Sequence, residues 1–302
     1  GTPKAALLGI LASWLRRVPR RAYFLQGLRL EGSTGVARRI LWLMEWLTAS
    51  ASTQIVAVSP SLRAAYLHLG IGRRTPVTVP GQGSSHGINT EHFVPRPKDS
   101  AVLVAHGLDP DTVTLAFIGR LTADKGPDAL IQALPRIAEQ GERVQVIVVG
   151  AQDEPDSAVY RDQLVAAGGR VAVVDEVPDV RPLLGAADIL VLPTRREGMP
   201  NVVLEASAMG VPVITTDATG AVDSVVDGVT GIIVPVDDTR ALAAAVVRLA
   251  RDPELRKRFG EAGRQRMIDH FQPGRVAAEV ALVVLGDGYP TVTATATRRR
   301  SR

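Results

Sequence analysis

Residues 113–149 read VTLAFIGRLTADKGPDALIQALPRIAEQGERVQVIVV, and this stretch decides the fold. Two apolar runs rich in β-branched residues, at 113–118 and 144–149, flank a helical pattern at 127–139. Continuous apolar runs indicate strands that are buried on both faces, and strands that alternate with helices form parallel sheets. The stretch therefore predicts a strand–helix–strand unit of a parallel sheet.

The same alternation continues to residue 270 and predicts a complete doubly wound domain, with helices on both faces of its sheet. Further strands are expected at 171–174, 189–192, 211–215 and 232–234, and helices at 157–167, 178–185, 200–209, 239–250 and 253–270.

A shorter α/β segment precedes this domain. Its strands are expected at 22–25, 54–59 and 76–79, and its helices at 5–15, 36–47 and 61–69. Three strands are about half of a doubly wound sheet, so we expect the opening strands of this domain to be missing. The predicted organisation is a partial N-terminal domain at 1–95, a linker at 96–112, a C-terminal domain at 113–270, a helix at 271–287 and a flexible tail at 288–302.

Composition excludes several classes of protein. The chain has 302 residues, no cysteine, 46% hydrophobic and 22% charged residues, which excludes a disordered chain, a collagen-like repeat and a disulfide scaffold. Without cysteine there is no thiol nucleophile and no Cys-ligated metal. The five histidines show no i, i+4 pair, so no metal site is expected. A bilayer-spanning run of about 18 apolar residues is also absent from the sequence.

Three short motifs point to other chemistries, and their context argues against each. The stretch at 83–87 matches the G-x-S-x-G elbow of hydrolases, but no helix is expected after it. Asp109 and Asp111 lie in the linker, where paired carboxylates solvate a turn. The sequence at 150–152 does not complete G-x-G-x-x-G, and no P-loop occurs.

Charge is distributed unevenly along the chain. Residues 1–95 hold eleven basic residues against three acidic ones, whereas residues 96–287 hold twenty basic against twenty-eight acidic. The first segment is therefore expected to face an anionic partner, or to be a solvated basic face. Nucleic acid is not expected, because no reader motif is present and aromatic residues for base stacking are few.

The candidate site lies at the carboxyl ends of the C-terminal strands, where open α/β sheets bind ligands. Arg120 and Lys125 follow the first strand, and two cations on one glycine-flanked loop suit a diphosphate. After the strand at 189–192, Glu197 precedes a helix and Glu205 lies about two turns inside it. Pro200 fits the first turn of that helix, so the backbone N–H groups at 198–201 are expected to face an anion. Two carboxylates on either side of a diphosphate site match the layout of a sugar nucleotide.

At these residues the chain resembles the family-4 retaining glycosyltransferases of the GT-B fold. The resemblance covers the C-terminal domain and extends to the N-terminal segment through 56–59, 83–89 and 93–95. Residues 2–4 and 27–29 are similar to the branch that builds bacterial surface polysaccharides on a polyprenyl-diphosphate carrier. The matching C-terminal residues are Phe117-Ile118-Gly119-Arg120-Leu121, Lys125-Gly126, 187–193, the Glu197/Glu205 pair, 210–213, Asp227-Gly228 and Thr230-Gly231.

The resemblance implies two Rossmann-like domains that face a cleft, and transfer of a hexose from a nucleotide-diphosphate sugar, UDP-sugar favoured, with retained anomeric configuration. Arg120 and Lys125 would neutralise the departing diphosphate, so neither a metal nor another cofactor is expected. Glu197 would hold the donor sugar's hydroxyls and Glu205 the ribose, and Val177 would contact the base. The remaining donor-binding residues implied are Gly119, Gly198, Met199, Pro200, Asn201 and Val202.

Two departures from the family concern the acceptor side. Gln26 stands where many relatives carry a histidine, and an amide can donate a hydrogen bond but cannot titrate. The family's glycine-rich acceptor loop belongs ahead of residue 1, so donor binding is expected to survive even if transfer fails. Two alternatives therefore stay open: a non-catalytic nucleotide-binding remnant, and a GT-B-like sugar-nucleotide epimerase. A phosphorylase is disfavoured because Lys125 is committed to phosphate.

The basic N-terminal segment then gains a candidate partner. Six arginines lie beside apolar helical stretches that contain Leu15, Trp42 and Trp46, a mixture that suits an anionic membrane surface and a lipid-linked saccharide acceptor. Packing of those apolar faces inside the domain is the other interpretation. We expect a cytoplasmic protein, peripheral at the inner face of the plasma membrane. The arginines are Arg16, Arg17, Arg20, Arg21, Arg38 and Arg39.

Overall fold

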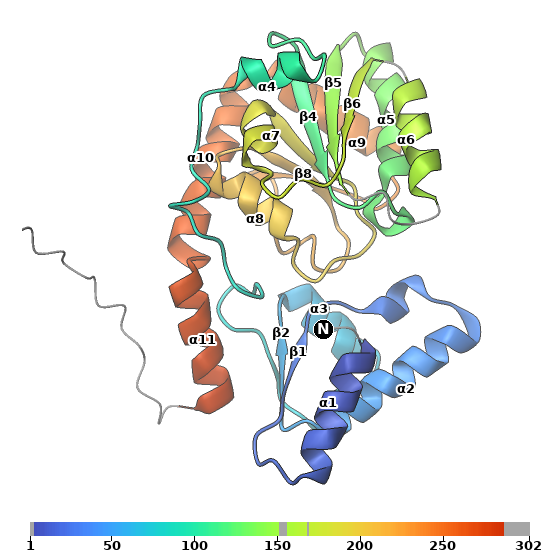
Figure 1. Ribbon diagram of the computed structural model, residues 1–302, viewed down its shortest axis with the longest axis vertical. Helices are drawn as coiled ribbons and strands as arrows, with labels where there is room; N and C mark the ends of the chain where they lie inside the picture. Colours follow the sequence, from blue (N-terminus) through green and yellow to red (C-terminus); the bar gives the residue numbers. More distant parts are fainter. Residues whose placement is uncertain (1–2, 151–155, 168, 287–302) are drawn as a thin grey trace, which may run out of the picture.

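Six parallel strands form the larger of two sheets in the computed structural model, which describes residues 3–150, 156–167 and 169–286 (Figure 1). The order across the sheet is β6-β5-β4-β7-β8-β9, and each neighbouring pair is parallel. This is the doubly wound arrangement, whose strand order reverses between β4 and β7. The strands are β4 (Val113–Ile118), β5 (Val144–Val149), β6 (Arg170–Val174), β7 (Ile189–Leu192), β8 (Val213–Thr216) and β9 (Gly231–Val234).

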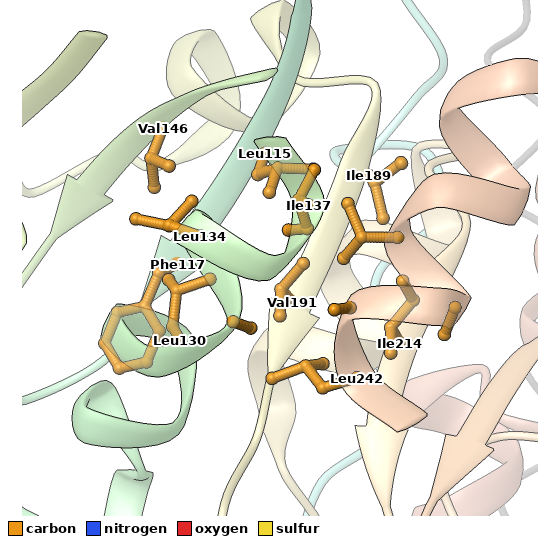
Figure 2. Packing of buried hydrophobic residues seen from close by; sticks show 14 of the residues in the cluster. Leu115, Phe117, Leu130, Leu134, Ile137, Val146, Ile189, Val191, Ile214 and Leu242 are labelled. Atoms are coloured by element: carbon orange, nitrogen blue, oxygen red, sulfur yellow. The ribbon is translucent and has the colours of Figure 1, made fainter. Parts of the chain in front are cut away.

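Helices cover both faces of this sheet, as its apolar strands predicted. Leu115 and Phe117 of β4 pack against one layer of helices, and Figure 2 shows Phe117 beside Leu130 and Leu115 beside Ile137. Ala116 and the other alternate residues pack against the opposite layer, because successive side chains of a strand point to opposite faces. The first layer contains α5 (Pro127–Glu139), α6 (Ser157–Ala166) and α9 (Thr239–Arg251), and the second contains α4 (Ser100–Ala105), α7 (Arg181–Ala186) and α8 (Asn201–Ala208).

Helix α4 lies inside the predicted linker at 96–112 and was missed by the sequence analysis. The Asp99 side chain caps it by accepting hydrogen bonds from the N–H groups of Ala101 and Val102. Its Leu103 is fully buried against the C-terminal sheet. The helix has only six residues, too few for its periodicity to stand out among the prolines and charges around it.

Three parallel strands, in the order β1-β2-β3, form the smaller sheet, in agreement with the predicted three strands. Its core is not confined to the N-terminal domain, because Met199, Leu204, Met267 and Phe271 of the C-terminal half belong to the same buried cluster. The elements are α1 (Pro3–Leu15), β1 (Ala22–Leu25), η1 (Arg29–Gly32), α2 (Gly35–Ala51), β2 (Gln54–Ala57), α3 (Pro60–His68) and β3 (Val77–Thr78).

The last two helices tie the domains together. Helix α10 (Pro253–His270) packs on α8 in the C-terminal domain, and α11 (Pro273–Leu285) runs from there alongside the N-terminal domain (Figure 1). Between the two helices, the Phe271 carbonyl accepts a hydrogen bond of 2.7 Å from the Ile88 N–H. Helix α10 has its predicted bounds and α11 lies within the helix predicted at 271–287, whereas the tail predicted at 288–302 lies outside the described residues. Within the described part of the chain, every helix is too short or too polar to span a bilayer.

Candidate functional site

A cavity of about 520 Å³ lies between the two domains, at the carboxyl ends of β4 and β7 where the strand order reverses. It brings together four of the predicted C-terminal residues, Arg120, Lys125, Glu197 and Gly198, with Gln26 of the N-terminal domain. The remaining lining residues are Pro3, Tyr23, Gly27, Leu28, Arg29, Asp124 and Arg196.

The loop after β4 carries the basic residues into this cavity. It turns through a short 3-10 helix, η2 (Ala123–Lys125), and α5 begins directly after Gly126. Gly126 has φ +70°, and a Cβ there would lie 2.0 Å from the Pro193 carbonyl oxygen, so only glycine fits. This close contact between the loops that follow β4 and β7 places Lys125 beside Glu197.

Lys125 and Glu197 form an ion pair in which Nζ lies 2.6 Å from Oε1. Asp124 lies 3.8 Å from Lys125 Nζ and 3.4 Å from an Arg196 nitrogen. Burial raises the pKa of the Asp124 carboxyl, but the Thr122 hydrogen bond and the neighbouring Lys125 and Arg196 outweigh burial and leave it below its usual range. The cavity therefore holds a carboxylate at Asp124, and its charged groups are already ordered by one another.

The backbone at Gly198 lies against the N-terminal domain. A Cβ there would lie 1.9 Å from the Gln26 carbonyl oxygen, so a side chain would force the domains apart. On the other side, a Cβ on Gly220 would lie 2.4 Å from the Gly198 carbonyl oxygen. Three backbone segments, at residues 26, 198 and 220, are thus stacked without side chains between them.

The other predicted donor residues lie outside the residues that line this cavity. Met199 is buried in the core that the domains share. Pro200 caps α8, and its carbonyl accepts from the N–H groups of Val203 and Leu204. Gly119 directly follows β4, Asn201 is exposed at the first turn of α8, and Val177 and Val202 are partly buried against the C-terminal core.

Glu205 lies within α8 and, unlike Glu197, does not line the cavity. Its carboxylate makes no hydrogen bond or ion pair with the residues that the structure describes, and burial raises its pKa. A half-buried carboxylate without a cation is costly to ionise, and hydroxyl groups of a ligand would satisfy its oxygens.

Sequence reasoning missed Arg29, Asp124 and Arg196 in the cavity. Asp124 and Arg196 are the immediate neighbours of Lys125 and Glu197, so their positions were a usable signal. By contrast, Arg195 does not line the cavity and pairs with Asp128 at 2.6 Å. The sequence does not distinguish this structural role from the role of Arg196. Among the described residues no group of three His, Asp or Glu side chains is placed to hold a metal ion.

Comparison with known proteins identifies relatives that cover 90% of the chain. The family profile described as "Glycosyl transferases group 1" matches residues 102–266. The capsular polysaccharide biosynthesis glycosyltransferase CapM of Staphylococcus aureus is 37% identical over 274 residues, which cover 90% of this chain and 71% of CapM. An alpha-maltose-1-phosphate synthase of Mycolicibacterium smegmatis is 32% identical over 294 residues, which cover 90% of this chain and 74% of the synthase.

Solved structures share the fold. HepE of Anabaena, in complex with UDP and glucose, superposes with a TM-score of 0.80 at 22% identity and covers 93% of this chain and 75% of its own. WaaG, a glycosyltransferase involved in lipopolysaccharide biosynthesis, superposes with a TM-score of 0.71 at 19% identity. The superposition covers 90% of this chain and 80% of WaaG. These likenesses confirm the predicted α/β fold of the GT-B type.

Proposed function

The chain belongs to the group 1 glycosyltransferases, and from this membership we propose that it transfers a hexose from a nucleotide-diphosphate sugar to an acceptor hydroxyl with retained anomeric configuration. One observation carries the proposal: Arg120, Lys125, Glu197 and Gly198 surround a single cavity at the reversal of strand order. The relation to CapM, whose name places it in capsular polysaccharide biosynthesis, supports a polysaccharide precursor as the acceptor.

The charged groups of the cavity suit a diphosphate leaving group. Arg120 and Lys125 supply positive charge where negative charge develops as the bond to the sugar breaks. In the free protein Lys125 is paired with Glu197 at 2.6 Å, and this pair keeps both side chains oriented before the donor arrives. On binding, Glu197 turns its carboxylate to hydroxyls of the donor sugar, and Lys125 turns to the diphosphate. The chemistry then needs no metal.

The nucleotide occupies the α8 side of the cleft in this proposal. Glu205 binds the ribose diol, which relieves the cost of its burial, and Val177 contacts the base. A UDP-sugar is favoured as donor because HepE, which shares the fold, has been solved with UDP and with UDP-glucose.

The acceptor enters from the N-terminal domain. Gln26 lines the cavity beside Gly198, and its side chain is an amide that suits a sugar hydroxyl. We assign no protein nucleophile, because the two carboxylates of the cavity, Asp124 and Glu197, both lie beside cations. The acceptor oxygen instead attacks on the face from which the diphosphate leaves, and the anomeric configuration is retained.

A lipid-linked acceptor fits the surface formed by α1 and α2. The side chains of Trp14 and Trp46 are 53% and 42% exposed there. The Trp42 indole N–H instead donates a hydrogen bond to the Leu69 carbonyl, and its ring stacks on Trp46. Exposed aromatic residues next to arginines suit an anionic membrane surface, so we place the protein at the cytoplasmic face of the plasma membrane. The other exposed apolar residues of the two helices are Leu8, Leu15, Val36, Ile40 and Leu43.

Calorimetric titration with UDP, GDP and ADP tests the donor site. We expect micromolar binding of one diphosphate, and at least about tenfold weaker binding in Lys125→Ala and Glu205→Ala, because each loses a contact to the ligand. Lys98→Ala is the matched control, since Lys98 pairs with Asp188 at 2.7 Å outside the cavity. Equal binding by all variants, or none by the wild type, would contradict the site.

Product analysis tests the reaction. With the donor named by calorimetry, proton NMR of the product shows whether the new glycosidic bond keeps the donor's anomeric configuration. Recovery of an altered sugar nucleotide without an acceptor product would instead identify an epimerase, and binding without turnover would identify a nucleotide-binding remnant.

Vesicle flotation tests the membrane surface. We expect flotation with phosphatidylglycerol vesicles, less with phosphatidylcholine vesicles, and a loss of binding as salt screens the arginines. Replacement of Trp14 by serine weakens the binding several-fold if its ring inserts. A protein that stays at the bottom of the gradient with both vesicle types would contradict this assignment.

A further inference from the structure

Residues 219–223, which follow β8, form a bridging segment between the two domains. Hydrogen bonds join it to the N-terminal domain: Thr219 Oγ1 donates to Glu31 Oε1 at 3.0 Å, the Gly220 N–H donates to Ser61 Oγ at 2.7 Å, and the Ser61 N–H donates to Asp223 Oδ2 at 2.9 Å. The Ser61 hydroxyl also donates to Asp223 Oδ2. Its one proton and its lone pairs are therefore both used across the domain boundary.

Asp223 supplies the cap that α3 lacks within its own domain. Ser59 stands at the N-cap position of α3, but its side chain makes no capping bond, and its Oγ is buried without a partner among the described residues. The Asp223 carboxylate accepts from the first-turn N–H of Ser61 instead. A carboxylate at a helix N-terminus satisfies an otherwise unpaired donor and interacts favourably with the helix dipole.

The opposite side of the bridging segment holds Glu197. The Thr219 carbonyl accepts a hydrogen bond of 2.8 Å from the Glu197 N–H. Gly220 packs directly on the following peptide, since a Cβ at Gly220 would lie 2.5 Å from the Glu197 carbonyl oxygen. Thr219 and Gly220 thus contact the N-terminal domain on one side and the backbone of Glu197 on the other.

Arg266 anchors the segment within the C-terminal domain. Its guanidinium donates to the Asp223 carbonyl at 2.8 Å and the Ser224 carbonyl at 2.6 Å, and lies 5.0 Å from the centre of the Phe271 ring. This anchor leaves the Asp223 carboxylate directed at Ser61 and does not fix Thr219. The turn around Thr219 is held within the C-terminal domain by the Ala218 carbonyl, which accepts from the N–H groups of Ala221 and Val222, and the bonds from Glu31 and Ser61 add a second support from the other domain.

We propose that Ser61 and Glu31 are positioning residues, which act through the bridging segment to hold the Glu197 peptide in place beside Lys125 when the domains are docked. This makes the geometry of the donor site dependent on the acceptor-side domain. The ligand assigned to Glu197 rests on the proposed function. The link, meaning the hydrogen bonds that run from Ser61 and Glu31 through the bridging segment to the Glu197 N–H, does not rest on it. With this link, the donor site is fully formed only while the two domains are in contact.

Hydrogen exchange of the unliganded protein tests the link without any substrate. In Ser61→Ala we expect the Glu197 amide to exchange about tenfold faster, because the lost hydroxyl held two bonds to the bridging segment. Thr219→Val, which keeps the side-chain shape but loses the bond to Glu31, gives a smaller acceleration at the same amide. The conservative variant Ser61→Thr keeps a hydroxyl and restores slow exchange.

Ser224→Ala is the matched control, because the Ser224 hydroxyl donates only within the same loop, to the Ala221 carbonyl at 2.6 Å. Acceleration confined to residues 195–204 and 217–224 in the Ser61 and Thr219 variants, and absent from the control, supports the link. The same exchange at Glu197 in Ser61→Ala as in Ser224→Ala overturns it, as does an acceleration spread evenly over β4, β5 and β7.

Kinetics separate positioning from mere stability. In Ser61→Ala we expect kcat to fall about tenfold while the KM for the donor changes less than about twofold, since the cations that bind the diphosphate stay in place. Nucleotide binding in the same samples keeps the two conclusions apart. If exchange responds as expected but no nucleotide binds to any variant, the link stands and the proposed function fails.

Discussion

The two sheets of this protein are built by the same alternation of strands and helices but differ in how completely they are covered. All four residues of β7 in the C-terminal sheet are buried, whereas Phe24 in β1 of the N-terminal sheet is 37% exposed. The C-terminal sheet has its own helices on both faces, and the N-terminal core is completed by residues of the other domain. The contributing residues are Met199, Leu204, Ala208, Met267 and Phe271.

This difference divides the site into a self-supporting half and a dependent half. Arg120, Lys125 and Glu197 lie on loops of the domain that buries its own sheet, and of these three residues Glu197 is also linked to the N-terminal domain, through the bridging segment. Gln26 and Arg29 follow β1, whose packing depends on the neighbouring domain. The acceptor side is therefore the part of the cavity that loses order first.

The largest expected effect comes from replacing one phenylalanine in each sheet and comparing the two losses in the free energy of unfolding. Phe117→Ala empties a fully buried position in the C-terminal core, and we expect a loss of about 4 kcal/mol in the free energy of unfolding. Phe24→Ala removes a side chain that is already partly in water, so about 1 kcal/mol is expected. Urea denaturation followed by circular dichroism measures both.

Tryptophan fluorescence makes the same experiment domain-specific. All three tryptophans, at positions 14, 42 and 46, lie in the N-terminal domain. If that domain depends on its neighbour, Phe117→Ala moves the fluorescence transition as well as the dichroism transition, while Phe24→Ala moves the fluorescence transition alone. Equal losses from the two variants, or a fluorescence transition untouched by Phe117→Ala, would contradict the division.

The fold was largely predictable because buried parallel strands are continuous apolar runs. Strands β4, β5 and β7 and helices α5 and α10 have their predicted bounds, α11 lies within the helix predicted at 271–287, and prolines mark the start of all three helices. The strand predicted at 211–215 begins instead at Val213, because Pro212 has no N–H for the ladder. Helix α4 escaped prediction because tertiary packing of Leu103, rather than periodicity, stabilises it.

The sequence predicted the part of the site that lies within the C-terminal domain, but not the contacts between the two domains. Arg120, Lys125 and Glu197 follow strands whose carboxyl ends must share an edge of one sheet, so their proximity follows from topology. The Lys125–Glu197 pair, the stacking of Gly198 on Gln26 and the link from Ser61 to Asp223 depend on how two domains meet. No local pattern in the sequence encodes that arrangement.

A smaller effect concerns the buried acid of the N-terminal domain. Glu45 accepts hydrogen bonds from the hydroxyls of Tyr23 and Tyr66, and burial raises the pKa of its carboxyl above the usual range. The neutral form is favoured in the folded state. The stability this provides is present below the ordinary carboxyl pKa and is lost as pH rises through the raised value.

Glu45→Gln keeps the shape without the titration. At pH 7 we expect the variant to be more stable than the wild type by about 1 kcal/mol, and at pH 4 the two should agree. Fluorescence-detected denaturation across this range measures the difference in the domain that contains Glu45. A variant that is less stable at pH 7 would show that the ionised carboxylate is the form the tyrosines stabilise.

The smallest effect strengthens the dependent domain instead of weakening it. Gly9 lies in the middle of α1, and a Cβ there would meet nothing within 4 Å. Gly9→Ala should therefore stabilise the N-terminal domain by about 0.5 kcal/mol, because alanine loses less backbone entropy in a helix. Gly274→Ala is the control, since Gly274 has equally open space but lies in the first turn of α11, where the gain is smaller. The fluorescence transition should rise in Gly9→Ala while exchange protection of β4 and β5 stays unchanged. If protection of those strands rises as well, the C-terminal domain also depends on its neighbour, and the division of the site into two unequal halves does not hold.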